Sequence, residues 1–337
     1  MKEKLTAIFA KINFQKNWKI YVAALVGVAV LVTAIVLLAG SGNKTPEETT
    51  PEETTPDNTV NNTPVEKTYA LSIGVAVAKD LEGLKLDETV ATIVTDEAGK
   101  IVLCRFDCLS HTMKITDGVL DTKAPTSKVV LGDNYKMPSG SWAAQTAKLE
   151  SFLVGKTQTD VAAIVLNGGK LTDAEISAGC TFDVTDLLKA VNNAFNSTEK
   201  VTFKSTSTNF TAGLSAIGTV SGDATNAKLV ADYAGAVLVD GAVVAAILDC
   251  AEVELQNIGA NGAGKDNFAN TKREQGNSYM MNSGSWAKQA DAFAASAAGK
   301  TAANIEGLAI EGVAGCTMPY SPASFKTAIV AAVKAAR

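Results

Sequence analysis

A duplicated block is the most informative feature of this chain of 337 residues. Residues Ser127–Gln145 read SKVVLGDNYKMPSGSWAAQ, and residues Thr271–Gln289 read TKREQGNSYMMNSGSWAKQ. Gly-Lys-Thr follows each copy, and Glu-x-x-Ala-Gly-Cys-Thr comes later, with about eight residues fewer between these motifs in the second copy. A duplication of this length predicts two tandem homologous domains rather than a solenoid of short units.

The first 40 residues have the pattern of a membrane anchor. Residues 1–19 form a basic segment with Glu3 as the only acid, and residues 20–40 are an apolar run long enough for a transmembrane helix. Because positive charge stays on the cytoplasmic side, we expect a single-pass protein of the cell membrane with a cytoplasmic N-terminus and extracellular domains. A cleaved signal peptide is the alternative, although its apolar region is normally shorter.

A stalk and two domains are expected to follow the anchor. Residues 41–68 are rich in Thr, Pro and Glu, a composition that predicts a disordered, extended segment. The remaining chain suits two repeat domains, at residues 69–196 and 197–337. The net charge is −5, and no basic patch is present, so the sequence argues against nucleic acid as a partner.

Each repeat contains the pattern of a β-hairpin. In the first, strands at 91–95 and 101–106 flank a turn at Asp96–Gly99. In the second, strands at 235–239 and 243–248 flank Asp240-Gly241, and Asp-Gly between apolar runs is a strong hairpin signal. The pairs Asp107-Cys108 and Asp249-Cys250 are expected just after these hairpins.

Helices are expected after the hairpins. Ser141 and Ser285 are candidate N-caps for helices that begin at each tryptophan. Further helices are predicted at 160–165, at 185–195 and at 324–333. The sequence therefore predicts an α+β fold, with a small antiparallel sheet covered by helices in each repeat.

Two features are better explained by structure than by chemistry. Gly-Lys-Thr lacks the preceding glycine of a nucleotide-binding P-loop, so Gly155 and Gly299 are interpreted as helix C-caps. His111 is the single histidine, and without a counterpart in the second repeat it is interpreted as a surface strand residue. No cluster has zinc-ligand spacing, and no Ser/His/Asp set of a hydrolase is repeated.

The five cysteines leave two possibilities open. Four of them match between the repeats, and symmetry suggests the disulfides Cys108–Cys180 and Cys250–Cys316, with Cys104 left over. The alternative is that these cysteines are buried, reduced thiols.

Aromatic residues also recur in the block. Tyr135, Met137 and Trp142 return as Tyr279, Met281 and Trp286. They fit core packing at the start of a helix, or alternatively an aromatic platform for a flat ligand.

The segment Glu175–Thr181, with an Ala-rich helix after it and a hairpin with Asp-x-x-Gly-Lys before it, resembles the FMN-binding domain family. This family includes membrane-anchored, extracytoplasmic flavoproteins of Gram-positive bacteria that carry FMN on the threonine of D-x-x-[ST]-G-A-T. The resemblance implies a flavin transferase and a membrane or extracellular redox partner. It assigns FMN attachment to Thr181 and Thr317, with Gly179 and Gly315 as the motif glycines.

The motif departs from the family pattern at three positions. Glu175 and Glu311 replace Asp, Ala178 and Ala314 replace Ser or Thr, and Cys180 and Cys316 replace Ala. Under the FMN hypothesis Trp142, Trp286, Tyr135 and Tyr279 would lie near the isoalloxazine, and the protein would relay electrons at the cell surface. The alternative from the sequence is a cofactor-free binding or structural module of the same fold.

Overall fold

The computed structural model describes residues 65–177, 179–281, 284–309, 313–316 and 322–337. The predicted cytoplasmic segment, transmembrane helix and most of the stalk lie outside the described residues. Among the described residues, no helix is long and apolar enough to cross a membrane.

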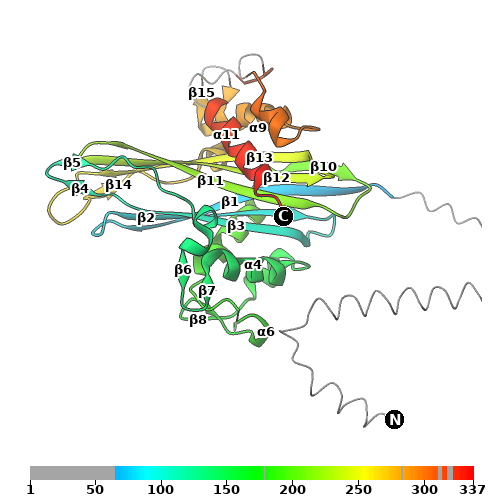
Figure 1. Cartoon of the computed structure of the whole chain (residues 1–337), viewed down its shortest axis with the longest axis horizontal. Helices are drawn as coiled ribbons and strands as arrows, with labels where there is room; N and C mark the ends of the chain where they lie inside the picture. Colours follow the sequence, from blue (N-terminus) through cyan, green and yellow to red (C-terminus); the bar gives the residue numbers. More distant parts are fainter. Residues whose placement is uncertain (1–64, 178, 282–283, 310–312, 317–321) are drawn as a thin grey trace, which may run out of the picture. The chain divides into compact units, whose positions relative to one another are not determined.

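Two four-stranded antiparallel sheets form the centre of the described chain (Figure 1). The first has the order β10-β1-β2-β3, and the second has the order β11-β12-β13-β14. Their strands are β1 (Lys67–Asp80), β2 (Lys85–Thr95), β3 (Ile101–Thr112), β10 (Val201–Ser205), β11 (Thr211–Gly222), β12 (Asn226–Val239), β13 (Ala242–Gln256) and β14 (Lys265–Asp266). Short two-stranded ribbons are formed by β4 (Ile115–Thr116) with β5 (Val119–Leu120), β6 (Lys136–Met137) with β7 (Gly140–Ser141), β8 (Leu166–Asn167) with β9 (Lys170–Leu171), and β15 (Met280–Met281) with β16 (Gly284–Ser285).

Both predicted hairpins are confirmed, with longer strands than expected. In the first, Asp96 Oδ1 accepts hydrogen bonds from the N–H groups of Ala98 and Lys100, and Gly99 takes a φ of 71°. In the second, Asp240 and Gly241 both have positive φ, as a two-residue hairpin turn of this kind requires. The pairs Asp107-Cys108 and Asp249-Cys250 lie within β3 and β13, not after them.

The helices begin where the capping residues predict. Ser141 and Ser285 accept hydrogen bonds from Ala144 N–H and Lys288 N–H, which confirms both as N-caps. The helices are α3 (Lys128–Leu131), α4 (Trp142–Leu153), α5 (Gln158–Ala162), α6 (Ala174–Ser177), α7 (Thr185–Asn196), α8 (Lys272–Gln275), α9 (Trp286–Ala295), α10 (Ala302–Glu306) and α11 (Pro322–Lys334), with the 3₁₀ turns η1 (Gly132–Asn134) and η2 (Gly276–Ser278). The predicted helices at 185–195 and 324–333 correspond to α7 and α11, whereas the helix predicted at 160–165 is α5, which starts and ends earlier in the chain.

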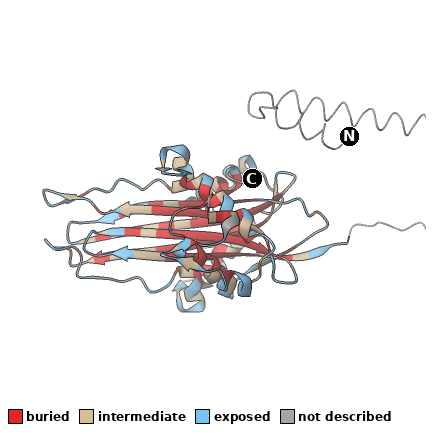
Figure 2. Cartoon of the chain, turned by 90° about the horizontal axis from the view of Figure 1, so that it is seen from below, coloured by how far each residue is buried: buried red, intermediate tan, exposed pale blue. Residues whose placement is uncertain are grey.

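The two sheets pack face to face, and helices cover their outer faces (Figures 1 and 2). Leu71, Val90 and Val94 of the first sheet share a buried cluster with Tyr233 and Ile247 of the second. On the outer sides, α4 and α7 pack on the first sheet, and α9 and α11 pack on the second. Residues 65–337 therefore have an α+β fold in which the repeats share one apolar interior.

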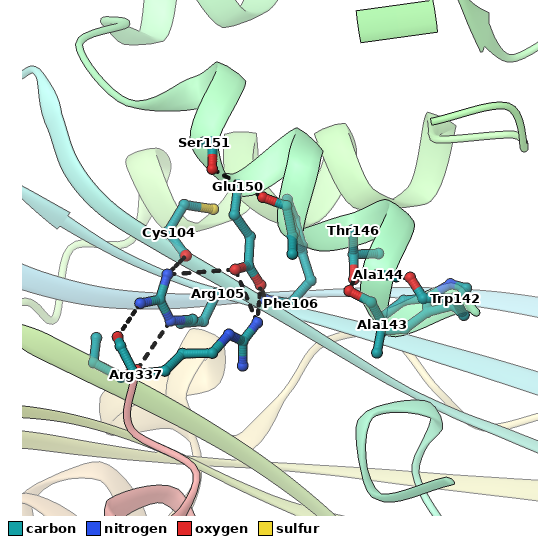
Figure 3. Close-up of polar contacts among 12 residues, drawn as sticks. Cys104, Arg105, Phe106, Trp142, Ala143, Ala144, Thr146, Glu150, Ser151 and Arg337 are labelled. Atoms are coloured by element: carbon teal, nitrogen blue, oxygen red, sulfur yellow. Dashed lines mark hydrogen bonds and ion pairs between the residues drawn. The ribbon is translucent and has the colours of Figure 1, made fainter. Parts of the chain in front are cut away.

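Polar contacts also join the repeats. Figure 3 shows Glu150, 4% exposed, held by Arg105 of β3 and by Arg337, whose Nη2 lies 2.9 Å from both carboxylate oxygens. Arg105 Nε also donates to Ala212 O, and its guanidinium donates to Arg337 O. Burial raises the pKa of Glu150, and the two arginines oppose that shift. Residues from both halves of the chain thus meet around one buried carboxylate.

Candidate functional site

Each tryptophan of the repeated block is a core residue. Trp142 and Trp286 are 3% and 1% exposed, and each begins a helix behind its serine cap. The Trp286 ring meets Phe325 edge-on at a centroid distance of 5.3 Å. The Trp142 ring lies 6.4 Å from Phe182. Because neighbouring side chains cover the indoles, these residues offer no free ring face to a flat ligand.

Each tyrosine of the block lies beneath a lysine ammonium. Tyr135 and Tyr279 are half-buried, and their carbonyls accept hydrogen bonds from the N–H groups of the tryptophans. Lys128 Nζ lies 5.1 Å from the Tyr135 ring centroid, and Lys272 Nζ lies 5.2 Å from that of Tyr279. This repeated cation–π pair is worth about 0.5–2 kcal/mol.

Sequence reasoning missed these two lysines as site residues. The signal was present, because Lys128 and Lys272 are the second residues of the two copies of the block. Theirs is the only charge that the two copies of the block share.

The ammonium groups are neutralised differently in the two repeats. Lys272 pairs with Glu252 at 2.7 Å, and Lys228 shares the same carboxylate at 3.5 Å. In the first repeat, Asp87 pairs instead with Lys85 at 2.6 Å. Among the described residues, Lys128 has no carboxylate within ion-pair distance. Burial lowers the pKa of Lys128, but Cys108, Tyr135 and Asp87 together outweigh that effect and raise it.

The different position of the carboxylate in the two repeats follows from the sheet register. Asp87 faces Ser110 across β2 and β3, whereas the equivalent pair across β12 and β13 is Val230 and Glu252. The carboxylate has thus moved to the opposite member of a cross-strand pair while the lysines stayed. This compensation is typical of a structural charge balance.

The cysteines beside these lysines are poor nucleophiles. Burial raises the pKa of the Cys108 and Cys250 thiols, which keeps them protonated near neutral pH. All five cysteines are free, and the symmetric disulfides suggested by the sequence are not formed. The alternative of reduced thiols is the one observed, with Cys316 only partly buried.

A small cavity lies at the first of these clusters. It has a volume of about 160 Å³ and is lined in part by Lys128, Tyr135, Trp142 and Phe182. Pockets for drug-sized ligands have about 300–1,000 Å³. The residues present therefore do not fit an isoalloxazine against Trp142.

The threonine assigned to FMN attachment is hydrogen-bonded to helix α4. Thr181 N–H and Thr181 Oγ1 both donate to Gln145 Oε1, at 2.9 and 3.0 Å. A side chain at Gly179 would meet the Lys148 methylenes, so the motif glycine is covered rather than open. The N-terminus of α7 faces Asp183, whose Oδ1 accepts from Thr185 N–H. This carboxylate disfavours a phosphate at the same place.

The corresponding positions of the second repeat are described only in part. Gly315 has a φ of 84°, and Thr317 lies outside the described residues. The described residues therefore bring Thr181 together with Gln145 and Gly179 together with Lys148, and they place Trp142 and Tyr135 beside Phe182.

Gly-Lys-Thr has a purely structural role. Gly155 and Gly299, both with positive φ, donate from N–H to the carbonyls of Ile101 and Val243 at the start of the second hairpin strands. Thr157 then caps α5, as Thr301 caps α10, each in a capping box. The interpretation of both glycines as helix C-caps is wrong, because the C-caps are Val154 and Ser296 and the glycines follow them. The motif instead connects the chain after each helix to a strand before the next helix starts.

Besides Glu150, three further buried carboxyl groups were not predicted. Asp107 Oδ1 accepts from the N–H groups of Cys108 and Val129, and Asp249 Oδ1 does the same for Cys250 and Arg273, so each anchors a short helix to its sheet. Burial raises the pKa of each to about 6. The repeated Asp-Cys pair was the available signal.

The third carboxyl group has no counterpart in the second repeat. Glu88 is fully buried between the sheets, where Tyr233 Oη donates to its Oε2 at 2.6 Å. Its Oε1 has no hydrogen-bond partner in the described structure. Burial raises the pKa of Glu88 to about 8, against the opposing effect of the Tyr233 hydroxyl.

Metal chemistry finds no support in the described part of the chain. No group of three or more His, Cys, Asp or Glu side chains there could hold a metal ion. His111 lies on β3 as predicted, but it is half-buried, and burial lowers its pKa.

No family model, curated protein or solved structure matches this chain.

Proposed function

We propose that this chain is a membrane-anchored module of the cell surface that acts by binding or by structural support, without a bound cofactor. The observation that carries the proposal is the burial of Trp142 and Trp286 at 3% and 1% exposure. The tryptophans of the duplicated block are thus part of the apolar interior. The charged side chains around them balance one another between the strands and the short helices.

The placement at the membrane rests on residues 20–40, whose apolar run and basic flank predict a spanning helix. Two sheets with helices on both outer faces make a rigid body for display outside the cell. Such a body can present surfaces and strand edges to other molecules.

The competing prediction is covalent FMN at Thr181 and Thr317. It is tested by producing the chain with a flavin transferase and measuring intact mass and visible absorbance after dialysis. We expect an unmodified mass and no flavin bands. A mass gain of one or two FMN groups, abolished by Thr181→Val with Thr317→Val, would refute the cofactor-free proposal.

A further inference from the structure

The two repeats differ at one sheet edge. In the first sheet, β10 covers the edge of β1 over Lys67–Leu71, whereas β11 is an edge strand that pairs only with β12. The sheet registers show which residues correspond at these two edges.

The register is anchored by the repeated aspartates. Asp107 and Asp249 face Val90 and Tyr233, which in turn face Val75 and Ala216. Four residues before these last two are Leu71 and Ala212. Leu71 and Ala212 are therefore equivalent positions on β1 and β11.

The first rung at this edge is present in both sheets. Leu71 pairs with Val201, the first residue of β10. Ala212 exchanges two backbone hydrogen bonds with Arg337, which therefore holds the position equivalent to Val201. The next rung in the first sheet is Tyr69 with Phe203. Its counterpart on the second sheet is Phe210, and no strand among the described residues pairs with it.

A hollow marks the place of the uncovered rung. It has a volume of about 480 Å³ and is lined by Tyr69, Val102 and Phe210 together with the turn at Asp96–Ala98. In the first sheet, Phe203 fills the corresponding place and packs against Tyr69 and Phe210, at centroid distances of 5.5 and 5.7 Å. The hollow therefore corresponds to the position of a second Phe203.

We propose that the edge Thr208–Phe210, next to the pair formed by Ala212 and Arg337, accepts an extended segment of a partner polypeptide as an added strand. An added strand gains main-chain hydrogen bonds from the edge, while pockets select its alternate side chains. The hollow selects an aromatic residue at the position equivalent to Phe203, which pairs with Tyr69 in the first sheet. Glu66, Asp96 and Glu97 line the same hollow against a single lysine, Lys67, so its net negative charge favours a segment that carries lysine.

This inference names the partner class of the binding module proposed above. Its test is independent of flavin, since peptide binding and FMN mass are measured separately and either result can fail alone.

The test uses a labelled synthetic peptide with the sequence of residues 202–206, Thr-Phe-Lys-Ser-Thr, which begins beyond the position held by Arg337, added to the intact protein. Fluorescence polarisation should show saturable binding. A peptide with Asp in place of Phe should bind at least about tenfold more weakly, because it loses the contact with Tyr69, Val102 and Phe210 and places a negative charge among the carboxylates of the hollow.

Two protein variants locate the site. Val102→Asp puts a charge into the hollow, and Thr208→Pro removes a backbone donor next to it in a loop where the fold does not depend on it. Each should weaken binding about tenfold or more. Val154→Asp, at an exposed apolar residue of a different hollow, should bind as the wild type does.

Thermal melts establish whether each variant is folded. If Val102→Asp does not fold, Thr208→Pro alone provides the test of the site. The proposal is overturned if the wild type does not bind the peptide, or if folded variants bind it equally well. Self-association on gel filtration that Val102→Asp abolishes would assign the edge to a second copy of the chain and would also overturn it.

Discussion

At the scale of single residues, the least expected group is Glu88. An ionisable carboxyl in the middle of two apolar sheets survives because it stays protonated and accepts a hydrogen bond from Tyr233. Sequence patterns could not reveal it, since Glu88 stands in a strand whose inner and outer faces are both buried. Only the opposing sheet shows that its side chain points inward.

Glu88 predicts a pH-dependent stability. Its folded pKa of about 8 lies above the ordinary value of 4.5, so the unfolded chain releases this proton at lower pH than the folded chain. The stabilising contribution is complete below about pH 4.5 and is lost as pH rises toward 8. Glu88→Gln removes the titration, so its stability relative to the wild type should increase between pH 5 and 8.

Urea melts at several pH values measure this difference, and Asp107 and Asp249 titrate in both proteins and cancel. Glu82→Gln, at an exposed carboxylate, is the matched control and should show no such trend. A difference between Glu88→Gln and wild type that stays constant from pH 5 to 8 would contradict the prediction.

The tryptophans give a second residue-scale prediction. Trp142→Ala and Trp286→Ala should each lower the free energy of unfolding by about 3–5 kcal/mol, since both remove a fully packed ring. Met280→Ala is the control within the same block, because Met280 is 62% exposed. Small losses for the tryptophan variants would favour the aromatic-platform hypothesis instead.

At the scale of elements, local sequence signals predicted the helix starts well, whereas the pairing of strands distant in the sequence could not be predicted. Ser141 and Ser285 identified the helix starts because a cap depends only on the next three residues. In contrast, β1 and β11 escaped prediction, since neither is joined to its neighbour by a strong turn sequence. The same limit applies to the candidate site. Recurrence identified Trp142 and Tyr135, but it could not show that the Trp142 ring is buried, because burial depends on residues distant in the sequence.

The capping box at Thr157 provides the element-scale prediction. Its Oγ1 accepts from Asp160 N–H at 3.3 Å, while its own N–H donates to Asp160 Oδ2 at 2.8 Å. Thr157→Ala should cost about 1 kcal/mol of folding stability, and Thr157→Ser should retain most of it. Denaturant melts decide between these values. An equal loss in both variants would show that the methyl group, not the hydroxyl, carries the effect.

At the scale of the whole molecule, the repeats are joined far more closely than tandem domains on a linker. The inner faces of both sheets are buried against one another, and β10, from the part of the sequence expected to belong to the second repeat, completes the first sheet. The sequence could not predict this arrangement, because a strand buried on both faces shows a continuous apolar run and not an alternation that reveals a partner. Arg105, Glu150 and Arg337, which join the repeats, likewise show no recurrence, since Ile247 and Ala294 hold the first two positions in the second repeat.

The shared interior predicts that residues 65–337 unfold in a single cooperative transition. Separating the repeats would expose the cluster around Tyr233 and leave Glu150 without Arg337, so neither half retains its full stability alone. Calorimetry should therefore give one peak whose calorimetric and van't Hoff enthalpies agree. Trp142→Ala in the first repeat and Trp286→Ala in the second should shift that same peak without splitting it. Two separated transitions, each moved by only one of the variants, would show instead that the repeats fold as independent domains and that the contacts between the sheets contribute little to stability.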